Sequence, residues 1–236
     1  MHTLNIVVSK DGPYVVSGGV PLALQKIVPN EEGYSWDWSE VMKFDPGADY
    51  KLCRCGRSGN KPFCDDSHIK AGFDGTETAV RQPFSAQAKA YDGMTLRLAD
   101  AKALCASARF CHPGGRIWSL VGQADPAARE LAIREAAHCP SGRLALYDKV
   151  SRNELEEEFE PSIIVVEDSP LGCSGPLWVR GGIGIESEGG QPYERRNRVT
   201  LCRCGASRNK PFCNGGHAVV KFRDGLVDLA RSPIVR

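Results

Sequence analysis

The sequence lacks the features that mark membrane, secreted and nucleic-acid-binding proteins. It has no run of about 18 apolar residues, so it predicts no membrane-spanning helix. The opening stretch, MHTLNIVVSKDGPY, carries no signal-peptide core and passes directly into a strand-like pattern. Its 30 Lys and Arg nearly balance 29 Asp and Glu, which argues against a basic surface for nucleic acid. We therefore expect a soluble, cytoplasmic protein with no nucleic-acid partner.

Recognisable catalytic motifs are also missing. We find no Ser/His/Asp set, no paired carboxylates at an evident pocket and no phosphate-cradling glycine loop. The glycine pairs at 18–19 and 181–182 are turn signals without the dinucleotide fingerprint. These absences favour a binding or carrier protein over an enzyme.

Cysteine, in contrast, is plentiful, since the chain has ten. Reducing compartments disfavour structural disulfides, so clustered cysteines there indicate metal or redox chemistry. Six of the ten lie in two nearly identical strings, CRCGRSGNKPFCDDSH at 53–68 and CRCGASRNKPFCNGGH at 202–217. The other four are Cys105, Cys111, Cys139 and Cys173.

The internal repeat extends beyond the cysteine strings. GPYVVSGGV at 12–20 matches GPLWVRGGI at 175–183, and an apolar run precedes each. Val, Ile, Tyr and Trp bounded by Gly-Pro and Gly-Gly predict strands. The sequence thus predicts two small β-rich units: a first unit at 1–80 and a second unit at 163–236. The first unit has a longer connector, in which YSWDW alternates like a strand and its tryptophans are expected to pack.

A central lobe, 81–150, belongs to neither copy. We predict a strand over 94–98, a helix over 101–111, a strand over 116–120 and a helix over 126–138 that opens on Pro126. The acidic segment 151–162 is expected to be a solvated linker. Arg195, Arg196 and Arg198 form a small basic group, which we interpret as a solvated strand face.

The spacing within each string divides its four candidate ligands into two pairs. In an extended loop, Cys53 and Cys55 can direct both thiolates at one metal atom. Cys64 and His68 are four residues apart and share a face on a helical turn, so they can bind a second metal atom. Two ligands on each of two irons fit a [2Fe–2S] cluster. The alternative is zinc, because three Cys and one His also make a closed zinc site, although zinc modules commonly open with cysteines further apart.

A histidine ligand has two consequences. The neutral imidazole makes the site less negative than a thiolate would, so reduction becomes easier, as in Rieske centres. Because the imidazole can be protonated, cluster retention and reduction potential become dependent on pH.

The whole pattern, C-x-C-x2-S-x3-P-x-C-x3-H, resembles the CDGSH iron–sulfur domain of the mitoNEET family. The resemblance implies a [2Fe–2S] cluster at each of two sites, which we name the first site (Cys53, Cys55, Cys64, His68) and the second site (Cys202, Cys204, Cys213, His217). Single-motif members of the family pair into two-fold dimers, so the tandem chain is expected to be a monomer with an internal pseudo-dimer. The strings depart from the family before the histidine, with DDSH in one and NGGH in the other. The carboxylate missing at Asn214 leads us to expect unequal potentials.

The central lobe carries a weaker cysteine pattern. Cys105 and Cys111, followed by Cys139-Pro140, resemble half of a bacterial ferredoxin in which Ala108 occupies the middle cysteine position. CPSGRL and the order of elements resemble the divergent mono-cluster ferredoxin domain. Three cysteines with one missing corner fit a [3Fe–4S] cluster. His112 or Cys173 could instead complete four ligands, and a cluster-free lobe with buried cysteines is the third possibility.

The sequence therefore predicts an α+β protein with two CDGSH units in an intramolecular pseudo-dimer and a ferredoxin-like lobe between them. We expect one-electron transfer or redox relay to a partner protein. Cluster storage, transfer to an apo acceptor, and pH or redox sensing are alternatives, as is a zinc-stabilised interaction module.

Overall fold

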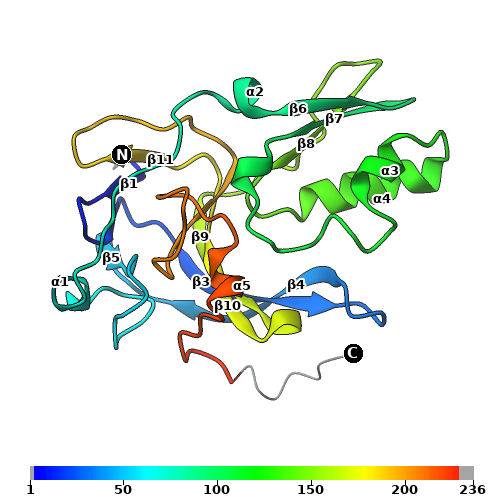
Figure 1. The fold of residues 1–236 in the computed structure, drawn as a ribbon. Coiled ribbons are helices and arrows are strands. Elements are labelled where there is room, and N and C mark those ends of the chain that lie inside the picture. The colour runs from blue at the N-terminus through cyan, green and yellow to red at the C-terminus, as the bar shows by residue number, and fades with distance from the viewer. Residues whose placement is uncertain (1–2, 229–236) are drawn as a thin grey trace.

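The computed structural model describes residues 3–228 and contains three β-sheets (Figure 1). The first sheet has the order β11-β1-β2-β5, built from β1 (Asn5–Val8), β2 (Tyr14–Ser17), β5 (Tyr50–Leu52) and β11 (Gly184–Ser187). The second has the order β12-β10-β9-β3-β4, built from β3 (Leu22–Pro29), β4 (Ser35–Phe44), β9 (Ser162–Asp168), β10 (Cys173–Arg180) and β12 (Arg198–Leu201). The expected strand in YSWDW is β4.

The two repeat units exchange one strand each. In both units the first strand forms a hairpin with the second, β1 with β2 and β9 with β10. The third strand of each unit crosses to the other, so that β11 pairs in parallel with β1 and β3 pairs in parallel with β9. Ile6 lies opposite Ile185, and Leu24 lies opposite Val165. The expected intramolecular pseudo-dimer is thus confirmed, and neither unit has a complete sheet without the other.

One hydrophobic core joins the units. Buried and partly buried residues alternate along β1 and β2. Ile6, Val8 and Val16 therefore point into the core, where they pack with Val165 and Leu177 of the second unit. Strand β9 is buried along its whole length because it lies between β3 and β10 in the second sheet. Its other face packs on Trp178, and Trp178 stacks on Trp38 with ring centroids 4.9 Å apart. The expected packing role of Trp38 is confirmed.

The central lobe has its own core and an antiparallel sheet of order β6-β7-β8. Its elements are β6 (Lys89–Asp92), β7 (Leu96–Asp100), α3 (Ile117–Val121), α4 (Pro126–Ala137) and β8 (Leu144–Asp148). Helix α4 begins as predicted: Pro126 occupies its first position, and the Asp125 side chain accepts a hydrogen bond from the amide of Ala127 at 3.3 Å. The fold is α+β, as the sequence indicates.

Two predictions for this lobe are wrong. Residues 101–111 form only the short 3₁₀ turn η1 (Lys102–Leu104), followed by a loop with left-handed backbone at Ser107 and Arg109. The segment expected as a strand at 116–120 is helix α3, whose Ile117, Leu120 and Val121 share the face that packs into the lobe core. A five-residue apolar segment is compatible with both the helical and the strand period, and packing against α4 selects the helix.

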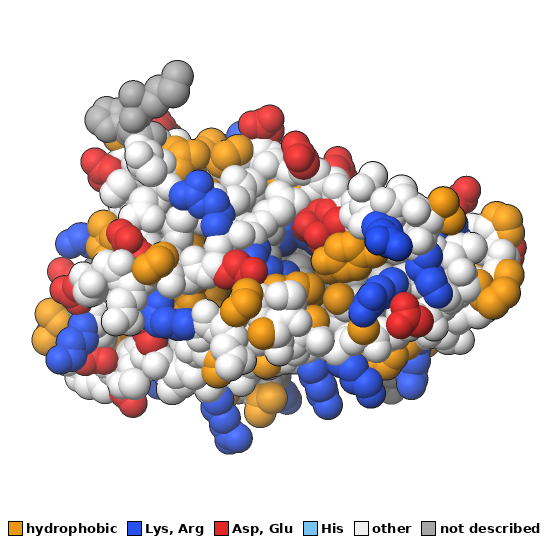
Figure 2. Space-filling model, turned by 90° about the horizontal axis from the view of Figure 1, so that it is seen from above, with side chains coloured by type: hydrophobic (Ala, Val, Ile, Leu, Met, Phe, Trp, Pro, Cys, Tyr) orange, Lys and Arg blue, Asp and Glu red, His pale blue; other side chains and the backbone are white. Residues whose placement is uncertain are grey.

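The remaining helices are single turns, namely α1 (Ser67–Lys70), α2 (Phe84–Gln87), η2 (Ser169–Leu171) and α5 (Gly216–Val219). Within residues 3–228, no helix has the length and apolar character needed to cross a bilayer. Figure 2 shows one face of the molecule, on which acidic and basic side chains are interspersed.

Candidate metal centres

Each cysteine string forms a closed loop that brings its ligands together in pairs. In the first string, Cys53 donates a backbone hydrogen bond to Pro62, and Cys64 donates one to Lys51 of β5. The Sγ atoms of Cys53 and Cys55 are 3.9 Å apart, and Cys64 Sγ is 3.5 Å from His68 Nδ1. The matching distances in the second string are 3.7 and 3.3 Å. Two donors on one tetrahedral metal, with bonds of about 2.0–2.3 Å, stand about 3.5–3.8 Å apart, so each pair fits one metal atom.

The pairs are separate from one another. Around a single tetrahedral ion, all four donor atoms would lie within this short range. In the described part of the chain, sets of three or more potential ligand atoms within 4.8 Å of one another occur twice, and neither contains three ligands of one string. One is Cys64 with Asp66 and His68, and the other is Asp168 with Cys173 and His217. The arrangement therefore suits two metal atoms per string better than one.

Backbone amides point at the sulfurs, as expected for sites that stabilise thiolates. The amides of Arg57 and Asp66 each lie 3.4 Å from a cysteine Sγ, Cys55 and Cys64 respectively. Asp66 adopts the left-handed conformation with φ 63°, which Gly215 shares at the matching position with φ 82°. The Ser58 hydroxyl donates to the carbonyl of Phe63, so it supports the loop and does not contact a sulfur.

The second site is the more strongly perturbed electrostatically. The thiols of Cys202 and Cys204 share one proton: a hydrogen bond from Cys204 and nearby amides lower the pKa of Cys202, while Cys202 and burial raise the pKa of Cys204. Burial raises the pKa of Cys213. Burial, together with the positive charges of Arg203 and Arg109, lowers the pKa of His217 to about 4. A neutral imidazole and a thiolate are the protonation states that bind metal.

The residue between the first two cysteines of each string is a buried arginine, and the sequence analysis overlooked its role. Arg54 donates to the carbonyls of Ser9 and Gly75, and its guanidinium lies over the ring of Tyr14. A tight CxC turn does place the middle side chain away from the metal, as expected, but here this direction leads into the core.

The second arginine has a different environment. Arg203 donates to the Val166 carbonyl and forms ion pairs with Glu167 and Asp224, both buried. Each arginine anchors its ligand loop to the first hairpin of its own unit. The arginine between the first two cysteines of both strings was the sequence signal that could have predicted this anchoring role.

The three central cysteines form a third group. Burial, with Cys139 and Cys105 nearby, raises the pKa of Cys111 to about 12. Arg143, held by an ion pair to Asp100, also interacts with Cys105. Ala108 is buried in a small cluster with Phe110 of the same loop and Ile27 of β3, against which Trp38 of β4 packs.

The two candidates for a fourth central ligand lie in different places. Cys173 is buried beside Asp168 and His217 and therefore belongs to the surroundings of the second site. His112 directly follows Cys111 and is exposed.

Comparison with protein families decides what these loops are. A model described as "Iron-binding zinc finger CDGSH type" matches residues 11–69 and again 174–218. A model described as "Divergent 4Fe-4S mono-cluster" matches residues 91–149. The chain is a tandem CDGSH protein with a divergent mono-cluster domain between its two CDGSH segments, and it binds iron–sulfur clusters. No curated protein and no solved structure matches it.

The two CDGSH sites differ in burial. In the first, Cys64 and His68 are half-buried, and Asp65 and Asp66 beside them are exposed. In the second, Cys213 and His217 are each 2% exposed. The central lobe accounts for part of this difference, because its cysteine loop lies against the turn that carries Gly215.

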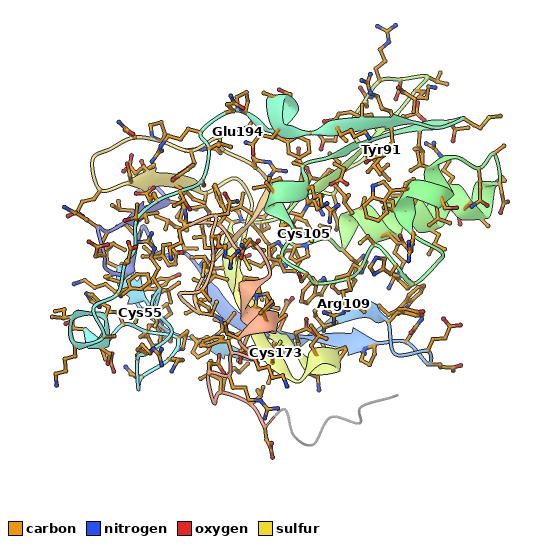
Figure 3. All side chains as sticks on the ribbon, in the orientation of Figure 1. Cys55, Tyr91, Cys105, Arg109, Cys173 and Glu194 are labelled. Carbon is orange, nitrogen blue, oxygen red and sulfur yellow. The ribbon has the colours of Figure 1, made fainter. Side chains whose placement is uncertain are left out.

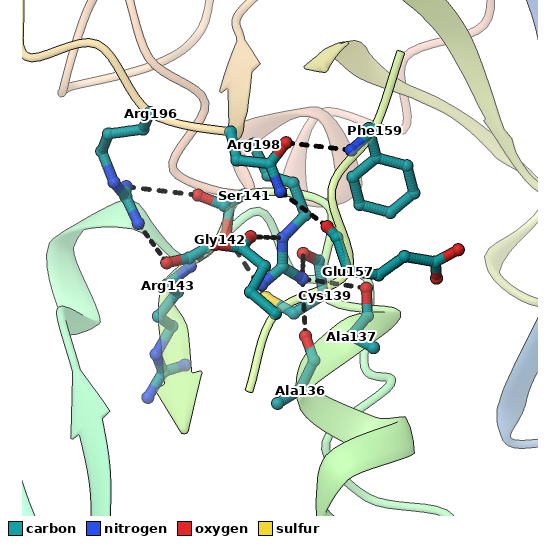
Figure 4. A network of polar contacts seen from close by, with 12 residues as sticks. Ala136, Ala137, Cys139, Ser141, Gly142, Arg143, Glu157, Phe159, Arg196 and Arg198 are labelled. Atoms are coloured by element: carbon teal, nitrogen blue, oxygen red, sulfur yellow. Dashed lines mark hydrogen bonds and ion pairs between the residues drawn. The ribbon is translucent and has the colours of Figure 1, made fainter. Parts of the chain in front are cut away.

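The basic group before the second CDGSH string is a solvated face only at Arg195, which is exposed, and the interpretation is wrong for Arg196 and Arg198. Arg198 is buried, and its Nη1 donates to the carbonyls of Ala136, Ala137 and Cys139 at 2.6–2.9 Å (Figure 4). Arg196 donates to the carbonyls of Ser141 and Gly142. These two side chains attach the C-terminal end of α4 and the Cys139 loop to the second CDGSH unit.

The acidic segment 151–162 also contacts the second CDGSH unit. The Glu156 carboxylate forms an ion pair with Arg198, which is a contact that the linker interpretation did not foresee.

Proposed function

We propose that each CDGSH site holds one [2Fe–2S] cluster, with Cys53, Cys55, Cys64 and His68 as ligands in the first and Cys202, Cys204, Cys213 and His217 in the second. The observation that carries this proposal is the pairing of donor atoms. Each CxC supplies two sulfurs within 3.9 Å, and each Cys-x3-His supplies a sulfur and an Nδ1 within 3.5 Å. Because no three of the four meet within 4.8 Å in the described chain, the pairing supports two irons over a single zinc.

Cys105, Cys111 and Cys139 are the ligands of a third cluster in this proposal, with [3Fe–4S] as its form. Support comes from Ala108, whose buried side chain cannot supply a fourth ligand, and from Cys173, which is engaged beside His217. The matched domain description favours [4Fe–4S] as the alternative, with the exposed His112 as its candidate fourth ligand. Iron and sulfide counts distinguish the two.

The function that fits best is one-electron transfer. A bound [2Fe–2S] cluster takes up and releases one electron, here from a donor protein and to an acceptor protein. The histidines make each site less negative than a fourth thiolate would, which favours the reduced state.

The domains of this proposed carrier follow the sequence prediction, with units at 1–80, 81–150 and 163–236 and the segment 151–162 connecting the last two. All ten cysteines are free, which supports a reducing compartment, the cytoplasm. We expect a monomer, because each exchanged strand has its partner within the chain.

Replacing each ligand histidine separately tests the assignment. His68→Cys and His217→Cys each add a negative charge to one site, so each variant should lower one midpoint potential in an anaerobic redox titration and leave the other in place. The opposite CDGSH site in the same chain is the internal control. Two variants with wild-type titrations would refute the ligand assignment.

Cluster transfer from the first site is a second candidate function. It is favoured by the partial exposure of Cys64 and His68 and by the exposed Asp65 and Asp66 around them. It predicts that an apo acceptor protein takes up iron and sulfide from the first site before the second. If acceptor loading is unchanged in a Cys53→Ser, Cys64→Ser variant, this candidate fails.

A further inference from the structure

The three cysteine sites are arranged in sequence through direct contacts between their ligand loops. The contacts join the central site to the second site and the second site to the first. The order of the sites extends the proposed electron-transfer function and depends on it.

The central ligand loop lies directly on the second site. A Cβ atom at Gly215, between the ligands Cys213 and His217, would collide with the side chain of Ser107 and would come within 3.7 Å of the Cys105 carbonyl oxygen. Asn209 of the second string donates to the carbonyl of Ala103 at 3.1 Å. A side chain at position 215 is therefore incompatible with this contact.

An ion pair strengthens the same contact. Arg109, in the central ligand loop, holds the buried carboxylate of Asp168 through two hydrogen bonds of 2.9 and 2.7 Å. A carboxylate oxygen of Asp168 lies within 4.8 Å of a ring nitrogen of His217. The central loop thus reaches the surroundings of the second-site histidine through one intervening side chain. Figure 3 shows Cys105 and Arg109 on this loop, above Cys173.

The second and first sites meet through their CxC turns. A Cβ atom at Gly56 would stand 2.9 Å from the carbonyl oxygen of Cys204, and one at Gly205 would stand 2.7 Å from that of Cys55. Both glycines have positive φ, so the backbone of each turn approaches the other across the pseudo-two-fold. Cys55 and Cys204 also line one shared groove of about 300 Å³.

The first site has no such contact with the central one. The hydrogen bonds, ion pairs and ring contacts described for residues 105–111 reach Ser35, Trp38, His138 and Asp168, and none of them reaches 53–68. Burial follows the same order. The difference lies in the Cys-x3-His pairs: Cys64 and His68 of the first site are half-buried, as are the three central cysteines, whereas Cys213 and His217 of the second site are buried.

We propose that the sites form an ordered row, central–second–first, in which the second site is the obligatory intermediate for electrons moving between the other two. In each step one electron leaves a reduced site and enters its oxidised neighbour, and no bond is formed or broken. Each end of the row has half-buried ligands, and these ends are the places where a one-electron donor protein and a one-electron acceptor protein exchange electrons with the chain.

Magnetic coupling between reduced sites tests the order. Three full-length variants each remove one site: Cys53→Ser with Cys64→Ser, Cys202→Ser with Cys213→Ser, and Cys105→Ser with Cys139→Ser. After reduction with dithionite, the saturation behaviour of the remaining [2Fe–2S] EPR signals reports their coupling to the other remaining site. We expect clear coupling in the variants lacking the first or the central site, and coupling at least several-fold weaker in the variant lacking the second.

The row is overturned if the variant lacking the second site shows the strongest coupling, or if either of the other variants shows none. Should the second-site variant fail to fold, these other two still decide, because the row requires coupling in both. The proposed function fails differently: it is refuted by a wild-type protein without iron or without reversible reduction. A protein that holds three reducible clusters in another order overturns the row alone.

Discussion

At the scale of single residues, the two buried arginines distinguish the CDGSH sites from each other. Burial raises the pKa of Glu167, and the positive charge of Arg203 opposes this shift. Burial alone would raise the pKa of Asp224, but Arg203 outweighs it and holds that pKa below its usual value. Arg203 and Asp224 therefore form a neutral pair, whereas Arg54 is held by carbonyls and aromatic faces. The arginine beside the CxC turn of the first site thus has no buried carboxylate partner, and this difference favours reduction of the first site.

Removing the second-site carboxylate tests this difference. Asp224→Asn removes one negative charge beside Arg203, so the second-site potential should rise by roughly tens of mV in a redox titration. Asp74, the matching residue of the first unit, is exposed and bonded to Thr76, and Asp74→Asn is the control. An unchanged or lower second-site potential, or an equal shift in the control, would contradict the electrostatic account.

The ligands themselves could be predicted from the sequence, because thiol and imidazole spacing is a local property. The environment of each site could not be predicted in this way. Nothing local distinguishes Arg54 from Arg203, and their difference arises because Ser9 in one copy stands where Glu167 stands in the other. The pairing of Arg109 with Asp168 joins residues 59 positions apart, and no spacing rule identifies it.

At the scale of elements, the C-terminal end of α4 depends on Arg198 of the second CDGSH unit. The last carbonyls of a helix have no partner within it, and here a buried guanidinium supplies three hydrogen bonds across the interface.

Arg198→Gln should therefore destabilise the central lobe by about 3 kcal/mol. It should also lower the iron content toward that of the two CDGSH sites alone, measured by iron analysis after gel filtration. Arg195→Gln, at an exposed neighbouring position, is the control and should behave like wild type. Full iron retention in Arg198→Gln would show that the lobe does not rely on this cap.

Helix α4 also carries a buried glutamate that makes stability depend on pH. Oε1 of Glu135 accepts a hydrogen bond from the amide of Gly114 at 2.8 Å, while Oε2 is buried without a hydrogen-bond partner among the described residues. Burial raises the pKa of Glu135 to about 7. A pKa raised by folding contributes stability that is fully present below the unfolded value and is lost as pH rises through the folded value.

The unfolding temperature of the wild type should therefore fall between pH 6 and pH 8.5 by more than that of Glu135→Gln. The difference corresponds to on the order of 2 kcal/mol. Glu130→Gln, on the exposed side of the same helix, should retain the wild-type pH dependence. Parallel curves for Glu135→Gln and wild type would exclude Glu135 as the cause.

Element prediction succeeded where local signals were strong. Asp125-Pro126 fixed the start of α4, and apolar runs between glycines gave the strands of both units. It failed over 101–111, where alanines favour a helix. The packing of Ala106, Ala108 and Phe110 and the position of the cysteines instead impose a loop with positive φ at two residues.

At the scale of the whole molecule, the exchange of β3 and β11 makes the two CDGSH units one folding unit. The pseudo-dimer was predictable because the repeat is evident in the sequence, whereas the parallel pairings β1–β11 and β3–β9 were not. They follow from a shared core that forms only when both copies are present. The same architecture leaves the central lobe on one side of the pseudo-two-fold, which explains why the Cys-x3-His pair is half-buried in the first site and buried in the second.

The most direct test of the account is a metal and sulfide analysis of anaerobically purified protein, with EPR in both oxidation states. Two [2Fe–2S] clusters and one [3Fe–4S] cluster predict about seven irons and about eight labile sulfides per chain, with two distinct [2Fe–2S] signals after reduction. A colourless protein with zinc at the two cysteine strings and no labile sulfide would contradict it.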